Sequence, residues 1–333
     1  MPKIINYQAS YFDKLSLFYK NHWKNRRVED YLNYRLVKVS NNPLDIVKNL
    51  LAINDDDVVV GCSLFFPAKA DIHGEEQTIY WNHDIFVEEK YRGGLSMELL
   101  LRTNATERMF GFGMSPINRK IQKSLKTNFI AETIGYYIIN RWVVKIFLYK
   151  LGIISPKISN LRIIPDKIKV KGDVFELVKS AEDLVIPNGG YWNKGKLDVE
   201  MNRGIDFLKH RFFENFNTYY FYQNKTGEKK SYFVLRKIVS RGIPVISLVD
   251  FRYDLDDFCE YLKILRAVNM VAIKNRIPIV TTRSTILDKK IRFNPLAIRN
   301  ENKAEIITNI KNILSPSIFI TLADSDADLM IHL

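Results

Sequence analysis

The sequence has very little cysteine and histidine. Only Cys62 and Cys259 occur in 333 residues, far apart in the chain. This number excludes a disulfide framework and a cysteine-based zinc site, and it suits a reducing compartment. The five histidines are scattered, with no pair at a metal-ligand spacing. We therefore expect no bound metal and a cytoplasmic location.

A long uninterrupted apolar run is also missing. The chain does not begin with the apolar segment of a secretory signal. The most apolar stretch, 134–154, is interrupted by Asn140, Arg141, Lys145 and Lys150. It is a poor membrane span, and we expect no stable membrane insertion. A buried or half-buried helix is the simplest interpretation of this stretch, and a helix on a membrane surface is the alternative.

Positive charge is abundant. The formal net charge is +13, which favours a polyanionic ligand such as nucleic acid, coenzyme A or a nucleotide-diphosphate sugar. The basic residues are dispersed, and no helix-turn-helix or zinc-finger pattern occurs, so we do not expect nucleic acid as a partner. The hydrophobic fraction of 47% is ordinary for a globular protein, and the length suits more than one domain.

The first half of the chain alternates between β-type and helical patterns. The pattern predicts strands and helices in the order strand, strand, helix, strand, helix. These elements are expected at 57–66, 78–87, 96–108, 108–114 and 118–126.

The second half repeats this order. Two strands that form a hairpin, a third strand, a long helix and a last strand are expected at 219–223, 231–238, 243–251, 256–276 and 277–282.

A weak internal repeat accompanies the repeated order of elements. The segment 30–36, Asp-Tyr-Leu-Asn-Tyr-Arg-Leu, resembles 206–212, Asp-Phe-Leu-Lys-His-Arg-Phe. Self-similarity of this kind indicates duplicated units. Prolines and basic residues interrupt the periodic pattern at 152–171, so we expect two domains, 1–152 and 153–333.

One segment of the first half carries a ligand-binding pattern. A strand ends at Val87, a short charged turn follows, and Gly93 and Gly94 open a helix. Glycines allow a ligand to approach the backbone, and the unpaired N–H groups at the start of a helix bind phosphate. Arg92 adds a permanent positive charge. The pattern is suited to holding a pyrophosphate.

Tyr91-Arg92-Gly93, four residues after Val87, resembles motif A of the GNAT superfamily of acyltransferases. The resemblance implies an α/β (α+β) fold of two tandem GNAT-like domains, each a mixed, mostly antiparallel sheet flanked by helices. It also implies acyl-CoA as the donor substrate. The family's glycine positions fall here on Leu95 and Met97, so donor contacts are expected across a region. That region comprises Ile85, Phe86, Val87, Arg92, Gly93, Gly94, Leu95, Ser96 and Met97, with Asn118 on the next helix.

The resemblance implies direct transfer, in which an amine attacks the thioester while a base removes its proton. We expect His83 to be this base, because it shares a strand face with Trp81 and Val87 and because arylalkylamine acetyltransferases carry a histidine at the same offset. Asp84 is the second choice. Water relaying the proton past His83 is the alternative. Many members protonate the leaving thiolate with a tyrosine; here Ser124 stands near that position, and Ser124 or water would act.

The second half lacks a glycine-rich loop between its third strand and its long helix, so we expect a single CoA and an acceptor site between the domains. The length and tandem arrangement resemble bacterial dTDP-amino-sugar N-acyltransferases that use acetyl- or 3-hydroxybutyryl-CoA. The implied acceptor is a nucleotide-linked amino sugar for surface polysaccharide (O-antigen) biosynthesis. An aminoacyl-tRNA-dependent FemABX-like peptidoglycan transferase and a non-catalytic CoA- or nucleic-acid-binding GNAT-like protein are the alternatives. Candidate acceptor contacts are Trp81, Tyr191, Trp192, Asp250 and Arg252. The sequence leaves the oligomeric state open.

Overall fold

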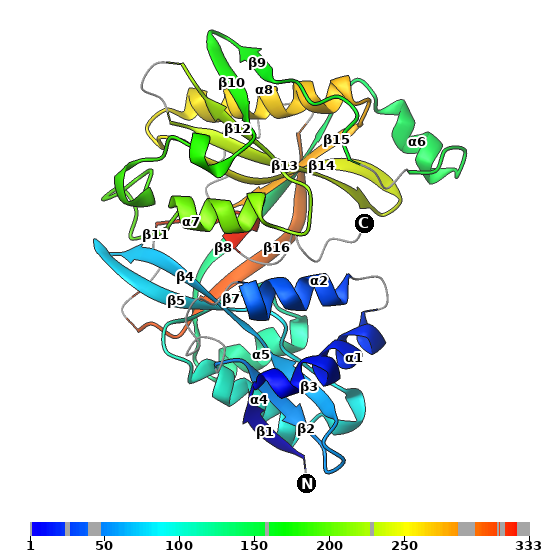
Figure 1. The fold of residues 1–333 in the computed structure, drawn as a ribbon, viewed down its shortest axis with the longest axis vertical. Coiled ribbons are helices and arrows are strands. Elements are labelled where there is room, and N and C mark those ends of the chain that lie inside the picture. Colours follow the sequence, from blue (N-terminus) through cyan, green and yellow to red (C-terminus); the bar gives the residue numbers. More distant parts are fainter. Residues whose placement is uncertain are drawn as a thin grey trace. The chain divides into compact units, whose positions relative to one another are not determined.

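The computed structural model describes residues 2–23, 27–38, 48–156, 160–226, 230–285, 297–311, 313 and 317–324 (Figure 1). Contacts divide the chain into two compact units. Unit 1 comprises 1–131 and 304–316, and unit 2 comprises 132–303 and 317–333. The chain passes from one unit to the other inside strand β8 (Asn128–Ile139) and again inside β16 (Ala297–Thr308). The first passage comes earlier in the chain than the boundary expected at 152.

Among its described residues, unit 1 contains two sets of paired strands, four α-helices and shorter 3-10 and π-helical turns. One sheet is antiparallel, in the order β1-β2-β3-β6, and the other has the order β4-β5-β7-β16 with β5 and β7 parallel. The elements are β1 (Lys3–Asn6), α1 (Phe12–His22), α2 (Val28–Asn33) with a π-helical turn (Tyr34–Lys38), β2 (Leu50–Ile53), β3 (Val59–Ser63), β4 (Phe65–Ile72), β5 (Glu75–Asn82), β6 (Phe86–Val87), a 3-10 turn (Glu89–Tyr91), α4 (Gly94–Asn104), β7 (Met109–Phe112) and α5 (Pro116–Ser124).

Helix α4 packs on the antiparallel sheet through a small apolar core. Leu99 is fully buried and contacts Val60, Val87 and Ala52, with Leu95 packed beside them. Burial of each large aliphatic side chain contributes about 1.5–3 kcal/mol, so this contact fixes where the helix begins relative to the end of β6.

The strand expected over 78–87 is interrupted. β5 ends at Asn82 and pairs with β4 and β7, whereas β6 pairs with β3 in the other sheet. The His83 N–H donates to the Leu64 carbonyl, and the Asn82 side-chain amide donates to Ser63 Oγ at 2.8 Å. These bonds move the chain from one sheet to the other at 83–85, so the regular alternation of faces does not run through His83.

Unit 2 is built on a larger sheet. Its strands have the order β8-β15-β14-β13-β12-β10-β9, with β14 and β15 parallel, and β11 and β17 also pair in parallel. α8 lies on one face and covers an apolar core that includes Ile264, Val268 and Phe233 (Figure 1). The elements are α6 (Val144–Lys150), β9 (Lys167–Val170), β10 (Asp173–Val178), β11 (Val199–Met201), α7 (Ile205–Leu208) with a π-helical turn (Lys209–Phe213), β12 (Tyr220–Asn224), β13 (Tyr232–Ser240), β14 (Ile243–Arg252), α8 (Phe258–Lys274), β15 (Ile279–Ser284) and β17 (Ile318–Phe319), with short 3-10 turns at Ala181–Asp183, Asn188–Gly190 and Leu322–Asp324.

The apolar stretch 134–154 is not one helix. Its first part belongs to β8, which pairs with β15 from Ile134 to Ile139, and only Val144–Lys150 forms the short helix α6. The expectation of a helix over the whole stretch was wrong because isoleucine and tyrosine at 134–139 suit a paired strand. Within the described ranges, no helix is both long and apolar enough to cross a bilayer.

The two units share a local arrangement. In each, an antiparallel hairpin is followed by a helix and then by a strand that pairs in parallel with the second strand of the hairpin, which is β5 in unit 1 and β14 in unit 2. The repeated segments 30–36 and 206–212 both lie at the end of a short α-helix that continues as a π-helical turn. Both matched arginines, Arg35 and Arg211, are buried. The mixed, mostly antiparallel α/β architecture expected from the sequence is confirmed.

Candidate active site

The end of β6 presents an open strand edge. β6 is the edge strand of its sheet within the described residues, and its inner edge bonds to β3, where the Glu88 N–H donates to the Val60 carbonyl. Successive N–H groups of a strand point to opposite edges, so the Val87 N–H points outward. β7 pairs with β5 only as far as Asn82. After Asn82 the chain continues into β6, which pairs with β3, so the strands separate at this point. An extended ligand with amide groups can bond to such an edge.

The N-terminus of α4 is open to an anion. Its N-cap, Gly93, has φ 103° and ψ −124°, a conformation that suits glycine alone, and no side chain caps the helix. The Met97 N–H bonds to the Gly93 carbonyl, which leaves the N–H groups of Gly94, Leu95 and Ser96 directed out of the helix. A Cβ atom on Gly93 or Gly94 would meet nothing within 4 Å. Helix ends of this kind bind phosphate.

Arg92 links the strand end to the helix start. Its Nε donates to the Val87 carbonyl at 3.2 Å, and its guanidinium lies 5.8 Å from the centre of the Phe86 ring. The side chain is exposed, so its positive charge faces solvent beside the open helix end. The predicted donor residues 85–87 and 92–97 are therefore brought together in one place by the structure.

A buried carboxylate lies at the interruption between β5 and β6. Asp84 is 8% exposed, and its Oδ2 accepts hydrogen bonds from Tyr19 Oη at 2.8 Å and Tyr31 Oη at 2.6 Å. The Cys62 thiol donates to the Asp84 backbone carbonyl. Burial and then the negative charge of Asp84 raise the pKa of Tyr19 well above its usual value, so this phenol keeps its proton and acts as a donor. Tyr19 and Tyr31 come from α1 and α2.

His83 and Trp81 occupy different environments. The His83 ring is half-buried and lies 6.4 Å from the Phe66 ring. Trp81 is completely buried and packs against Phe110, with ring centres 5.3 Å apart. His83 and Asp84 thus share the short connection between β5 and β6, whereas Trp81 lies in the core of unit 1.

The two predicted residues of α5 lie at opposite ends of that helix. Asn118 is in the first turn, where its backbone N–H donates to the Ser115 N-cap hydroxyl at 3.2 Å. Its side-chain Oδ1 is buried and has no hydrogen-bond partner among the described residues. Ser124 ends the helix, is exposed, and donates to the carbonyl of Ile121 at 2.7 Å.

Asp250 and Arg252 are completely buried in unit 2. Asp250 accepts hydrogen bonds from Arg203 Nε at 2.9 Å and Arg252 Nη1 at 3.0 Å. It also accepts from Tyr232 and Thr321, at 2.7 and 2.6 Å, and Arg203 reaches a second carboxylate, Asp324, at 2.6 Å. Burial by itself would raise the pKa of Asp250, but the two guanidinium groups outweigh it and hold the pKa below its usual value. The formal charges of the two arginines and two aspartates cancel, although Arg252 Nε has no hydrogen-bond partner among the described residues.

The remaining acceptor candidates lie in the loop before β11. Tyr191 is buried, and Trp192 is half-buried. The Trp192 indole N–H donates to the Lys230 carbonyl at 3.3 Å, and its ring meets Tyr232 edge-on at 5.1 Å. The Trp192 backbone N–H is held by Glu200. Trp192 is thus fixed by its backbone and ring while part of its side chain stays accessible.

Helix α8, which follows β14 as α4 follows β6, has a different start. Its N-cap is Asp257, whose carboxylate accepts the N–H of Glu260 at 3.2 Å. The chain's own negative charge therefore occupies the place where a ligand phosphate would bind. Of these two equivalent helix ends, only that of α4 is without a side-chain cap. Among the described residues, no three His, Cys, Asp or Glu side chains are arranged to hold a metal ion.

The sequence matches no protein-family model, and no curated protein matches it significantly. Solved structures do resemble it. A GCN5-related N-acetyltransferase from Anabaena variabilis aligns with a TM-score of 0.57 and 11% identity, over 92% of this chain and 72% of that one. Saccharomyces cerevisiae N-myristoyltransferase, solved with bound myristoyl-CoA and inhibitors, aligns with a TM-score of 0.59 and 9% identity, over 92% and 79%.

A third similar structure is a probable N-acyltransferase from Enterococcus faecalis, with a TM-score of 0.59 and 12% identity over 93% of this chain and 73% of that one. The alignments cover nearly the whole chain rather than one unit. At such low identity they establish the fold, and the chain has the fold of the GCN5-related N-acetyltransferases.

Proposed function

We propose that this protein is an acyl-CoA-dependent N-acyltransferase whose donor binds to unit 1. The observation that carries the proposal is the uncapped N-terminus of α4, with Gly93 in a glycine-only conformation directly after the open edge of β6. The shared fold supports it, because the similar structures are named as N-acetyltransferases or N-acyltransferases and one holds myristoyl-CoA. The fold alone, without this uncapped helix N-terminus, would not explain how the pyrophosphate of the donor is bound.

In this proposal, the two parts of the site bind two parts of the donor. The N–H groups of Gly94, Leu95 and Ser96 bind the pyrophosphate, and Arg92 adds its positive charge. The extended arm of the donor pairs with the outer edge of β6 through the Val87 N–H. The buried Oδ1 of Asn118 is a further polar group for the donor.

The reaction is a direct transfer. The amine nitrogen attacks the thioester carbonyl, a C–N bond forms, and the C–S bond breaks to release the thiolate. His83 takes the proton from the amine; Asp84 is the second candidate base. Water or Ser124 returns a proton to the thiolate. A backbone N–H group of the strand stabilises the negative oxygen of the intermediate.

The proposed acceptor is a dTDP-linked amino sugar, with an acetyl or 3-hydroxybutyryl group as the transferred acyl chain, for surface polysaccharide biosynthesis. The net charge of +13 favours a second ligand with phosphate groups. Trp192, held at its backbone and partly exposed, is a suitable surface for stacking a base or sugar ring. Asp250 and Arg252 remain candidates that would position the acceptor from within their network.

Donor binding is tested with glycine variants measured by isothermal titration with CoA. Gly94→Val places a side chain in open space where the phosphate would lie, without strain at a positive φ, and should raise the dissociation constant at least about tenfold because amide–phosphate bonds are lost. Gly93→Val should do the same. Gly74→Val, in the β4–β5 turn with φ 91°, is the strain-matched control and should bind CoA normally. Unchanged affinity in a folded Gly94→Val protein would exclude this helix end as the donor site.

Acceptor identity is tested separately by measuring thiol release from acetyl-CoA and 3-hydroxybutyryl-CoA with a panel of amines. Turnover with dTDP-amino sugars and not with free amino sugars is expected. No thiol release with any amine, together with transfer of an amino acid from aminoacyl-tRNA to a peptidoglycan precursor, would refute both the acyl-CoA donor and the sugar acceptor and leave the fold unaffected. CoA binding without either transfer would indicate a non-catalytic protein.

A further inference from the structure

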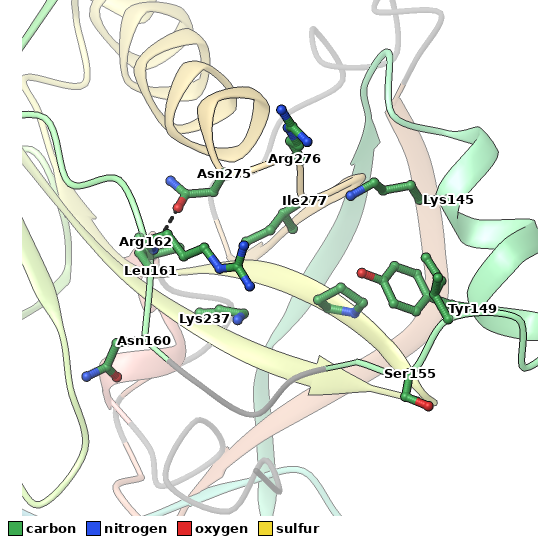
Figure 2. Close-up of a pocket in the computed structure, with 12 residues that line it drawn as sticks. Lys145, Tyr149, Ser155, Asn160, Leu161, Arg162, Lys237, Asn275, Arg276 and Ile277 are labelled. Carbon is green, nitrogen blue, oxygen red and sulfur yellow. Dashed lines mark hydrogen bonds between the residues drawn. The ribbon is translucent and has the colours of Figure 1, made fainter.

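Unit 2 contains a pocket in which positive charges gather without carboxylates. Its volume is about 270 Å³, room for roughly nine water molecules. Four basic side chains come from separate segments: α6, the loop before β9, β13 and the turn after α8 (Figure 2). They are Lys145, Arg162, Lys237 and Arg276. No Asp or Glu is among the described residues that line the pocket.

The charges in this pocket repel one another. The pKa of Lys145 is lowered by burial and by the neighbouring charges of Arg276 and Arg162, and that of Lys237 is lowered by burial and by Arg162. Among the described residues, no ion pair includes Lys145, Arg162 or Arg276. Such a cluster is costly for the protein alone, and an anion in the pocket would relieve it.

The pocket is firmly built. The Arg162 and Ile163 backbone N–H groups both donate to Asn275 Oδ1 at 2.9 Å, which fixes the loop that carries Arg162 to the turn that carries Arg276. Tyr149 of α6 lines the pocket and packs with Ile146 on an apolar cluster of β13 and β14. The backbone segments that carry Lys145, Arg162 and Arg276 are therefore fixed to one another within unit 2.

An exposed apolar face lies on the same helix. α6 packs its half-buried Ile146 and Tyr149 against unit 2, whereas Val144, Phe147 and Leu151 are 64%, 63% and 72% exposed. Their spacing of three and four residues places them on one side of the helix, directed away from unit 2. Ile153 follows at 64% exposed. Exposed apolar clusters of this kind mark interaction surfaces.

Tryptophan and basic side chains border this face. The Trp142 ring has Lys145, Arg276 and Arg141 within 6 Å of its centre, at 5.4, 5.8 and 5.9 Å. Tryptophan beside cations at the edge of an apolar surface is the composition of helices that lie in a membrane interface. The apolar face and the basic pocket are thus adjacent on one short helix.

We propose that α6 and the basic pocket form a docking site for an anionic phospholipid surface, with a lipid phosphate in the pocket and the apolar face of α6 in the acyl boundary. Charge complementarity selects this occupant. A second copy of the chain would meet the same patch in a two-fold interface and bring four cations against four cations. A neutral apolar partner would bring no negative charge to Lys145, Arg162 and Arg276. The site is separate from the donor site of unit 1 and does not depend on the proposed acyl transfer.

The experiment is vesicle flotation of the full chain with phosphatidylcholine vesicles, with and without phosphatidylglycerol. Binding is expected only when phosphatidylglycerol is present. Arg276→Glu should weaken binding roughly tenfold or more, because each basic residue near the surface contributes to the attraction. Arg266→Glu, an equal charge change at an exposed position of α8, is the control and should have a much smaller effect. Phe147→Ser should weaken binding at high salt as well as low, with Leu17→Ser, 58% exposed on α1, as its control.

The outcomes separate the possible occupants. Wild-type binding to both vesicle types alike, or to neither, overturns the proposal. Complete displacement from vesicles by inorganic phosphate, at unchanged ionic strength, would assign the pocket to a free phosphate compound instead. Sedimentation equilibrium in which wild type is a dimer and Phe147→Ser a monomer would assign the face to a second copy. CoA titration of each variant, expected to match wild type, keeps the result independent of donor binding.

Discussion

Asp250→Asn is expected to destabilise unit 2 strongly. In the wild type, two guanidinium groups with side chains 0–1% exposed share two carboxylates, Asp250 and Asp324. Asparagine keeps the shape of the side chain but removes its negative charge. Of the two carboxylates in the network, only Asp324 then remains to pair with Arg203 and Arg252. Loss of one partner from a buried pair typically costs about 3–5 kcal/mol, because the other charge stays buried without compensation.

The assay is urea unfolding followed by circular dichroism. With an m value of about 3 kcal/mol per molar urea, a loss of about 3–4 kcal/mol lowers the midpoint by about 1 M. Asp166→Asn is the matched control in the same unit: its ion pair with Lys179 is 74% exposed on both sides and should contribute at most about 1 kcal/mol. A loss below about 1 kcal/mol for Asp250→Asn would refute the reasoning that the network stabilises unit 2.

The pH dependence has a defined sign. The folded pKa of Asp250 lies below the unfolded value of about 3.9, so its ionised form stabilises the fold above about pH 4. This contribution is lost as the pH falls through the folded pKa. The difference in stability between wild type and Asp250→Asn should therefore be constant between pH 5 and 7 and shrink below about pH 4. A difference that grows toward acid would contradict the assignment.

Two further predictions concern unit 1. His83→Asn should lower turnover by on the order of a hundredfold and move the acidic limb of the pH profile, and a change of only a few-fold with an unmoved limb would exclude His83 as the base. Tyr19→Phe removes one donor from the buried carboxylate of Asp84 and should cost about 1–3 kcal/mol in urea unfolding, as hydrogen bonds to charged groups do. Tyr11→Phe, whose hydroxyl binds the exposed Asp57, is its control and should cost much less.

Local patterns were sufficient to predict most of the elements near the candidate site. The helix expected at 96–108 is α4 (Gly94–Asn104), and the strand expected at 108–114 is β7 (Met109–Phe112). Gly93 and Gly94 were expected to open a helix, and they are the N-cap and the first residue of α4. The long helix expected at 256–276 is α8 (Phe258–Lys274), since its apolar positions recur with helical spacing.

The interruption at 83–85 could not be predicted, because it depends on bonds to a neighbouring strand. The run 78–87 is β-rich throughout, and only the Asn82 amide on Ser63 and Leu64 diverts it. The polar clusters were missed for the same reason. Tyr19 lies 65 residues before Asp84, and Arg203 lies 121 before Asp324, so no local pattern connects them. A single sequence gives element type but not which distant polar groups meet.

Asp84 and Asp250, both buried, show how similar arrangements of strand and helix hold a carboxylate in different environments. Asp250 is saturated by two cations, so its pKa is held low and it has little tendency to accept a proton. Asp84 instead receives hydrogen bonds from the neutral phenols of Tyr19 and Tyr31, which stabilise the carboxylate without cancelling its charge. A carboxylate of that kind can still attract an ammonium group or share a proton. The N-caps of the two helices also differ, with Gly93 in α4 and Asp257 in α8. Of these two helix ends, only that of α4 is open to an anion. Both differences support the proposal that the donor binds to unit 1.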